Sequence, residues 1–150
     1  MDHNKYPVVF EPGHVSYVFL SEGPKGKIKK VVAYTMIIEG IYNLGFGDWD
    51  EEKMRIDDIS RSSNGDMDKV LATVAFTVLD FIQSNPDAII FIEGSSPART
   101  RLYQMKISDN WLEISGLICL YGYLDDDWVP FVPGRNYEAF QVRRKKRKFE

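Results

Sequence analysis

The pattern between residues 66 and 92 constrains the fold more than any other part of the sequence. One stripe of it is apolar (Val70, Leu71, Val74, Ala75, Val78, Leu79, Ile82) and the opposite stripe is polar (Lys69, Thr73, Thr77, Asp80, Ser84). This periodicity predicts an amphipathic helix over residues 67–84 that packs its apolar stripe on a core. Asn85-Pro86 ends the helix. The continuously apolar run 88–92 is then typical of a strand that is covered on both faces.

Turns divide the rest of the chain into further strands and one more helix. Alternating or apolar runs predict strands over 15–20, 28–38, 117–124 and 128–132. A serine N-cap followed by Pro97 predicts a second helix over residues 97–108. At 150 residues the chain is long enough for one hydrophobic core but not for two. We therefore expect a single α/β (α+β) domain, with a mixed, mostly antiparallel sheet of six or seven strands and two main helices.

Charge divides the chain into an acidic body and a basic end. The formal net charge is -3, from 19 basic and 22 acidic residues, and 13 of the basic and 21 of the acidic residues lie in 1–142. The basic run that follows comprises Arg143, Arg144, Lys145, Lys146, Arg147 and Lys148. Because like charges repel and resist burial, we expect a globular domain over 1–142 and a disordered tail over 143–150. The tail either keeps the protein soluble or makes weak, non-specific contact with nucleic acid, which the acidic body opposes.

The connection between the predicted strand 88–92 and the helix 97–108 is a candidate binding site. Its residues are Gly94, Ser95, Ser96 and Pro97. The first backbone N–H groups of a helix lack partners within the helix, and such groups bind anions. Arg99 or Arg101 would add positive charge, and Tyr103 shares a helix face with Arg99. We expect an anionic ligand or a protein partner here; the alternative is that both arginines pair with surface carboxylates.

The sequence shows no familiar catalytic or metal-binding arrangement. Cys119 stands alone in an apolar run, and His3 and His14 both lie near the N-terminus, so neither a zinc site nor a nucleophilic triad is expected. No apolar run approaches the roughly 18 residues that span a bilayer, and the N-terminus does not resemble a signal peptide. We expect a cytoplasmic protein with no metal, no cofactor and no membrane contact; the oligomeric state stays open.

Three segments carry a resemblance to a known family. They are Tyr42-Asn43-Leu44-Gly45-Phe46-Gly47-Asp48, Asn64-Gly65-Asp66 with Lys69-Val70-Leu71-Ala72-Thr73-Val74, and Gly94-Ser95-Ser96-Pro97-Ala98-Arg99-Thr100-Arg101-Leu102-Tyr103. Together they resemble an uncharacterised family of small bacterial proteins that is common in Bacteroidetes. This resemblance covers most of the chain and implies a stand-alone bacterial domain without a known activity.

A second resemblance rests on the order of the elements. Antiparallel strands, a helix opened by a polar loop, a buried strand and a helix bearing Leu102-Tyr103 resemble the core of GNAT-type N-acyltransferases. In that family the loop cradles the CoA pyrophosphate, which implies phosphate contacts by Arg61, Asn64 and Gly65. The family's tyrosine acts as a general acid near the thioester, which implies a catalytic role for Tyr103. Asn64 and Asp66 stand where the family has glycine or alanine.

Three functions follow as expectations. The first is a non-catalytic binding or regulatory module whose site lies at residues 94–97. The alternative is an N-acyltransferase that uses acetyl-CoA, as the second resemblance implies. The second alternative is a weak nucleic-acid binder that acts through the basic tail.

Overall fold

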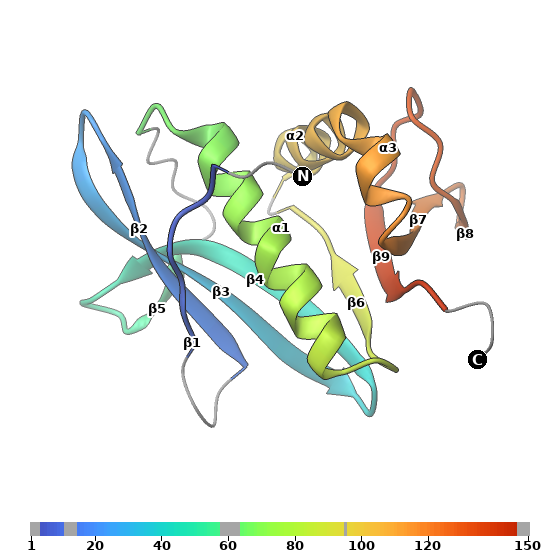
Figure 1. Ribbon diagram of the computed structural model, residues 1–150, viewed down its shortest axis with the longest axis horizontal. Helices are drawn as coiled ribbons and strands as arrows, with labels where there is room; N and C mark the ends of the chain where they lie inside the picture. Colours follow the sequence, from blue (N-terminus) through green and yellow to red (C-terminus); the bar gives the residue numbers. More distant parts are fainter. Residues whose placement is uncertain (1–3, 11–14, 58–63, 95, 147–150) are drawn as a thin grey trace.

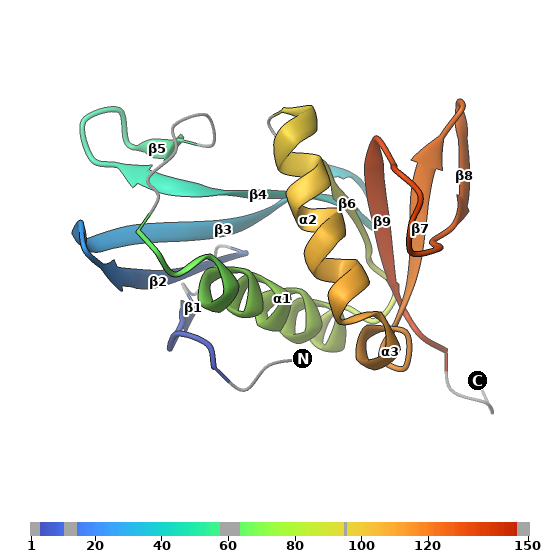
Figure 2. The same cartoon turned by 90° about the horizontal axis from the view of Figure 1, so that it is seen from above.

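The computed structural model describes residues 4–10, 15–57, 64–94 and 96–146, and its elements form two layers (Figure 1, Figure 2). The strands are β1 (Val9–Phe10), β2 (Ser16–Gly23), β3 (Gly26–Ile38), β4 (Ile41–Asp50), β5 (Arg55–Asp57), β6 (Ile89–Ile92), β7 (Ile118–Leu124), β8 (Asp127–Pro130) and β9 (Ala139–Arg144). The helices are α1 (Met67–Ser84), α2 (Pro97–Asp109) and α3 (Trp111–Ile114). All three helices lie against one face of a single sheet.

The sheet is mixed and mostly antiparallel. Its order is β1-β2-β3-β4-β6-β9-β7-β8, with β5 paired to β4. β4 and β6 form a parallel pair in which Leu44 lies opposite Ile92, and α1 makes the crossover that a parallel pair requires. β9 pairs antiparallel with both β6 and β7 and so joins the two parts of the sheet. The predicted α+β class is confirmed; β1 and β5 are too short to be seen as alternating patterns.

Helix α1 lies on the sheet with its threonine side, which corrects the predicted orientation of its polar stripe. Thr73 and Thr77 are both fully buried. The Thr73 hydroxyl oxygen accepts a hydrogen bond from the backbone N–H of Tyr6 (2.9 Å), and the phenol of Tyr17 donates to Asp80 Oδ2 (2.6 Å). Tyr6, which precedes β1, and Tyr17 of β2 therefore supply partners that let polar residues of α1 face the sheet. The apolar stripe is shared between the core and a second surface described below.

The end of the chain is more ordered than its charge predicts. Arg143 and Arg144 belong to β9, where Arg143 lies opposite Ile89 on one side and Cys119 on the other. The prediction that the chain is disordered from residue 143 onward is therefore wrong for these two residues. A strand accommodates them because Phe140 and Val142 face the core while Arg143 projects from the opposite face. Lys145 Nζ donates to the carbonyl oxygen of Ser115 (3.0 Å), and Arg147 and Lys148 lie outside the described residues.

Candidate functional site

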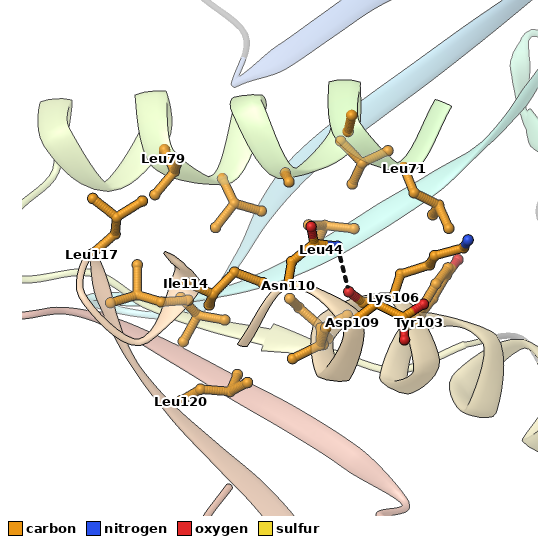
Figure 3. A pocket seen from close by; sticks show the side chains of 18 of the residues that line it. Leu44, Leu71, Leu79, Tyr103, Lys106, Asp109, Asn110, Ile114, Leu117 and Leu120 are labelled. Atoms are coloured by element: carbon orange, nitrogen blue, oxygen red, sulfur yellow. Dashed lines mark hydrogen bonds between the residues drawn. The ribbon is translucent and has the colours of Figure 1, made fainter. Parts of the chain in front are cut away.

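A cavity of about 360 Å³ lies between α1, α2, α3 and the sheet (Figure 3). Its apolar lining comprises Leu44, Phe46, Leu71, Ala72, Val74, Ala75, Val78, Leu79, Ile92, Ile107, Ile114, Leu117, Ile118, Leu120 and Val142. In Figure 3, Leu79 of α1 lies across this space from Ile114 and Leu120, and Leu71 lies at the other end, across from Lys106 and Tyr103. The volume falls within the range of small-molecule binding pockets, which are also mostly apolar.

The cavity exists because α1 has more apolar surface than the sheet can cover. Its threonine side occupies the sheet, so Leu71, Val74, Ala75 and Leu79 remain only half-buried. The apolar stripe predicts that these residues lie in the core, whereas the structure leaves them partly exposed to the cavity. The width of the apolar stripe is the sequence signal for this cavity, because a helix that covers only one surface needs a narrower apolar stripe.

Helix α2 forms the other wall and is held from its far side. The side chain of Gln104 is buried, donates to the carbonyl oxygen of Arg135 and accepts from the backbone N–H of Tyr137 (2.9 Å). These bonds anchor α2 to the loop before β9. Tyr103 and Ile107 then face the cavity without closing on α1. The sequence does not reveal this anchor, because a lone glutamine has no periodic pattern.

Polar groups gather where α2 ends and α1 begins. Lys106 Nζ donates to Asp68 Oδ1 and so ties the two helices together. Asn110 Nδ2 donates to the carbonyl oxygen of Lys106 (2.8 Å), the dashed line in Figure 3. Asp109 and Tyr103 complete the polar part of the lining. We call Asp68, Lys106, Asp109 and Asn110 the polar rim.

The turn at residues 94–97 satisfies its own hydrogen-bonding groups. The backbone N–H of Gly94 donates to Thr100 Oγ1 (3.0 Å), and that of Arg99 donates to Ser96 Oγ (3.3 Å). A Cβ atom on Gly94 would lie 2.5 Å from the Thr100 nitrogen, so the strand and helix are already in close contact. Arg101 is exposed, and Ser95 lies outside the described residues. The N–H donors of Gly94 and Arg99, two of those expected to hold an anion, are therefore used within the chain.

The loop residues expected at a phosphate instead hold the β2–β3 hairpin. Asn64 is buried; its Oδ1 accepts from the backbone N–H of Lys25 (2.8 Å), and its Nδ2 donates to the carbonyl oxygen of Gly26 (3.0 Å). Gly65 follows with a φ of 73°, a conformation that favours glycine. Asp66 precedes α1 but does not cap it with its side chain, and instead accepts from Tyr6 and Ser21. Arg61 lies outside the described residues.

Burial changes the acidity of two tyrosines beneath α1. It raises the pKa of Tyr34, and the hydrogen bond with Thr77 opposes this increase without cancelling it. It also raises the pKa of Tyr17, and the hydrogen bond to Asp80 adds to that increase. Both phenols therefore keep their protons at neutral pH and donate them to α1. They belong to the contact between helix and sheet and not to the cavity.

The candidate site residues thus separate in space. Of those expected from the sequence, Tyr103 lines the cavity, whereas Asn64 and the 94–97 turn do not. Arg143 lies away from it, with its guanidinium 5.6 Å from the ring centre of Tyr121. Within the described ranges, no group of three or more His, Cys, Asp or Glu is placed to hold a metal ion. No described helix has the length and apolar character needed to cross a membrane.

Comparison with known proteins gives a family and no activity. No curated protein and no solved structure is similar enough to this chain to count as a match. The model of one family, described as a family of unknown function (DUF6934), matches residues 2–145. The chain therefore belongs to this family of unknown function, DUF6934.

Proposed function

We propose that this protein is a non-catalytic binding module that holds a small, mostly apolar molecule between α1 and α2. The observation that carries the proposal is the 360 Å³ cavity, whose lining is apolar except for Tyr103 and the polar rim. Most of the lining is hydrocarbon, which binds a ligand through the hydrophobic effect, and the ionisable groups lie together at one end of the cavity, so the lining favours binding over catalysis. The polar rim at one end would fix the orientation of the ligand.

The expected affinity is weak. Burying a chain of about ten carbons gains about 8 kcal/mol at roughly 0.8 kcal/mol per CH₂ group. Association costs at least about 4 kcal/mol in lost translational and rotational freedom, which leaves a dissociation constant of about 1 mM or weaker. Such a value suits a protein that senses or carries its ligand reversibly.

The cavity is a better candidate than the sites expected from the sequence. An anion at the 94–97 turn would have to displace Thr100 and Ser96 from the N–H groups that they occupy. Binding of acetyl-CoA would need the loop before α1 to hold phosphates, yet Asn64 is committed to the hairpin. Opening either arrangement costs hydrogen bonds, whereas filling the cavity costs none.

Displacement of an uncharged dye tests the proposal. N-phenylnaphthylamine fluoresces in apolar surroundings, so its signal should rise with the protein and fall when decanol competes. Ala75→Trp should fill the cavity and abolish the signal. Ala98→Trp, the same change at an exposed position of α2, is the matched control and should bind as the wild type does.

Two results would contradict the proposal. One is a wild-type protein that binds neither dye nor decanol. The other is an Ala75→Trp variant that is folded, as judged by its melting curve, and binds both as well as the control. Titration with acetyl-CoA and with pyrophosphate in the same buffer tests the two rival sites directly.

A further inference from the structure

We infer that the ligand of this cavity is a cationic amphiphile, with an apolar body and an ammonium head group at the polar rim. The inference rests on the proposed function, because it concerns the same cavity. It follows from the way the charges of the rim pair with one another and from the end of α2 at which they lie.

The rim contains three charged side chains, of which two neutralise each other. Lys106 and Asp68 form an ion pair that joins α2 to α1. Asp109 is exposed and has no ion-pair or hydrogen-bond partner among the described residues. The rim therefore presents one uncompensated negative charge beside an apolar cavity. An ammonium group complements it without breaking any existing contact.

The end of α2 adds to this preference. Asp109 is the last residue of the helix, and the C-terminal end of a helix carries partial negative charge. Asn110 offsets part of this charge, because it donates to the carbonyl oxygens of Lys106, Ile107 and Ser108. The start of α1 has the opposite preference, because the N-terminal end of a helix carries partial positive charge and favours a negative group. Asp68 already provides a negative charge there, in the first turn of α1. The end of α2 is therefore the position left for a ligand head group, and it favours a positively charged one.

A carboxylate head group meets a different situation. It would have to take Lys106 away from Asp68 and would then stand near both Asp68 and Asp109. The whole chain, with 19 basic and 22 acidic side chains, is also net negative and weakly disfavours anions at long range. The charges of the rim and of the body therefore select in the same direction.

Three probes with one chain length separate the head groups. Decylammonium, decanol and decanoate are titrated at neutral pH and low ionic strength, below their aggregation concentrations. Pairs of partly exposed charges contribute modestly, so decylammonium should bind about twofold to fivefold more tightly than decanol, and decanoate more weakly than decanol. Raising the salt concentration should bring the three affinities together, because exposed charges are screened.

Matched variants assign the effect to one side chain. Asp109→Asn should remove the preference, so that decylammonium and decanol bind this variant with equal affinity. Asp87→Asn makes the same change at an exposed position outside the cavity and should keep the preference. Ala75→Trp should abolish binding of all three probes, which shows that they enter the cavity.

Each remaining outcome overturns a defined claim. If decanol binds and decanoate equals or exceeds decylammonium, the head-group inference is wrong while the proposed function stands. The same conclusion follows if Asp109→Asn keeps the full preference. If none of the probes binds the wild type, the proposed function and this inference fail together.

Discussion

The phenol oxygen of Tyr34 lies 2.8 Å from the hydroxyl oxygen of Thr77, in the middle of the contact between β3 and α1. Thr77 uses its own proton on the carbonyl oxygen of Val74 (2.7 Å), so Tyr34 is the donor of the pair. The ring of Tyr34 also stacks on Phe81 with centroids 4.2 Å apart. These contacts fix which side of α1 faces the sheet, and the apolar stripe is left to line the cavity.

Thr77→Val should destabilise the protein by about 1 to 3 kcal/mol, because it leaves the buried Tyr34 hydroxyl without an acceptor. The change conserves shape, so packing contributes little. Adding Tyr34→Phe should recover part of the loss, since the orphaned group is then gone. Urea denaturation of the two single variants and the double variant measures this coupling. Strictly additive losses would show that the hydrogen bond does not matter.

Gly122→Ala tests a close contact on β7. A Cβ atom there would lie 2.2 Å from the ring of Tyr137, whose backbone N–H is bonded to Gln104. We expect a loss of about 1 to 3 kcal/mol from overpacking. Gly45→Ala is the control, because its Cβ atom would meet only Ala33 O at 3.8 Å and should cost much less. Equal melting temperatures for the two variants would contradict the packing seen here.

The sequence predicts the elements of this fold better than it predicts their faces. Spacing and stop signals are local, and they place α1, β6 and α2 within a residue or two. The burial of Thr73 and Thr77 is not local, because it depends on Tyr6, which precedes β1, and on Tyr34 of β3, and both come into contact with α1 only on folding. A polar stripe on a helix therefore predicts a solvent-exposed face only if no other part of the fold can form hydrogen bonds with it.

The candidate cavity is harder to predict from the sequence than the helices and strands are, for a related reason. The turn at Gly94 has the composition of an anion site, but Thr100 provides an internal partner that no motif describes. The position of α2, one wall of the cavity, depends on contacts of Gln104 with residues some thirty positions later in the chain. Arg143 shows the same limit, because its place in β9 is set by pairing with β6 and β7.

Truncating Leu79 and Ile82 should have unequal effects, although both lie on the apolar stripe of α1. Ile82 is 2% exposed and belongs to the core, so Ile82→Ala should cost about 2 to 5 kcal/mol. Leu79 borders space that is already open, so Leu79→Ala should cost clearly less. Chemical denaturation compares the two. Equal losses would mean that the cavity closes around Leu79 in solution.

Neutralising the basic end should change nucleic-acid binding without changing stability. Two of its residues are held in β9, so Lys145, Lys146, Arg147 and Lys148 can neutralise at most about four phosphates, with a logarithmic salt slope of about -3.6 on duplex. Changing all four residues to Gln should abolish the binding of duplex DNA through the tail and leave the melting temperature nearly unchanged. Binding that survives would have to come from the body, for example from Arg143 beside Tyr121.

Stability should fall steeply in alkali because of the tyrosines beneath α1. The pKa values of Tyr17 and Tyr34 are raised above the ordinary 10.0, chiefly by burial, so the folded protein keeps protons that the unfolded chain loses. Their contribution is complete below about pH 10 and declines as the pH rises beyond it, by up to about 1.4 kcal/mol per pH unit for each tyrosine. Urea denaturation between about pH 9 and 11.5 measures the slope. Tyr17→Phe should reduce the slope by the share of one tyrosine. An unaltered slope in Tyr17→Phe would show that this phenol is accessible to solvent in the folded state.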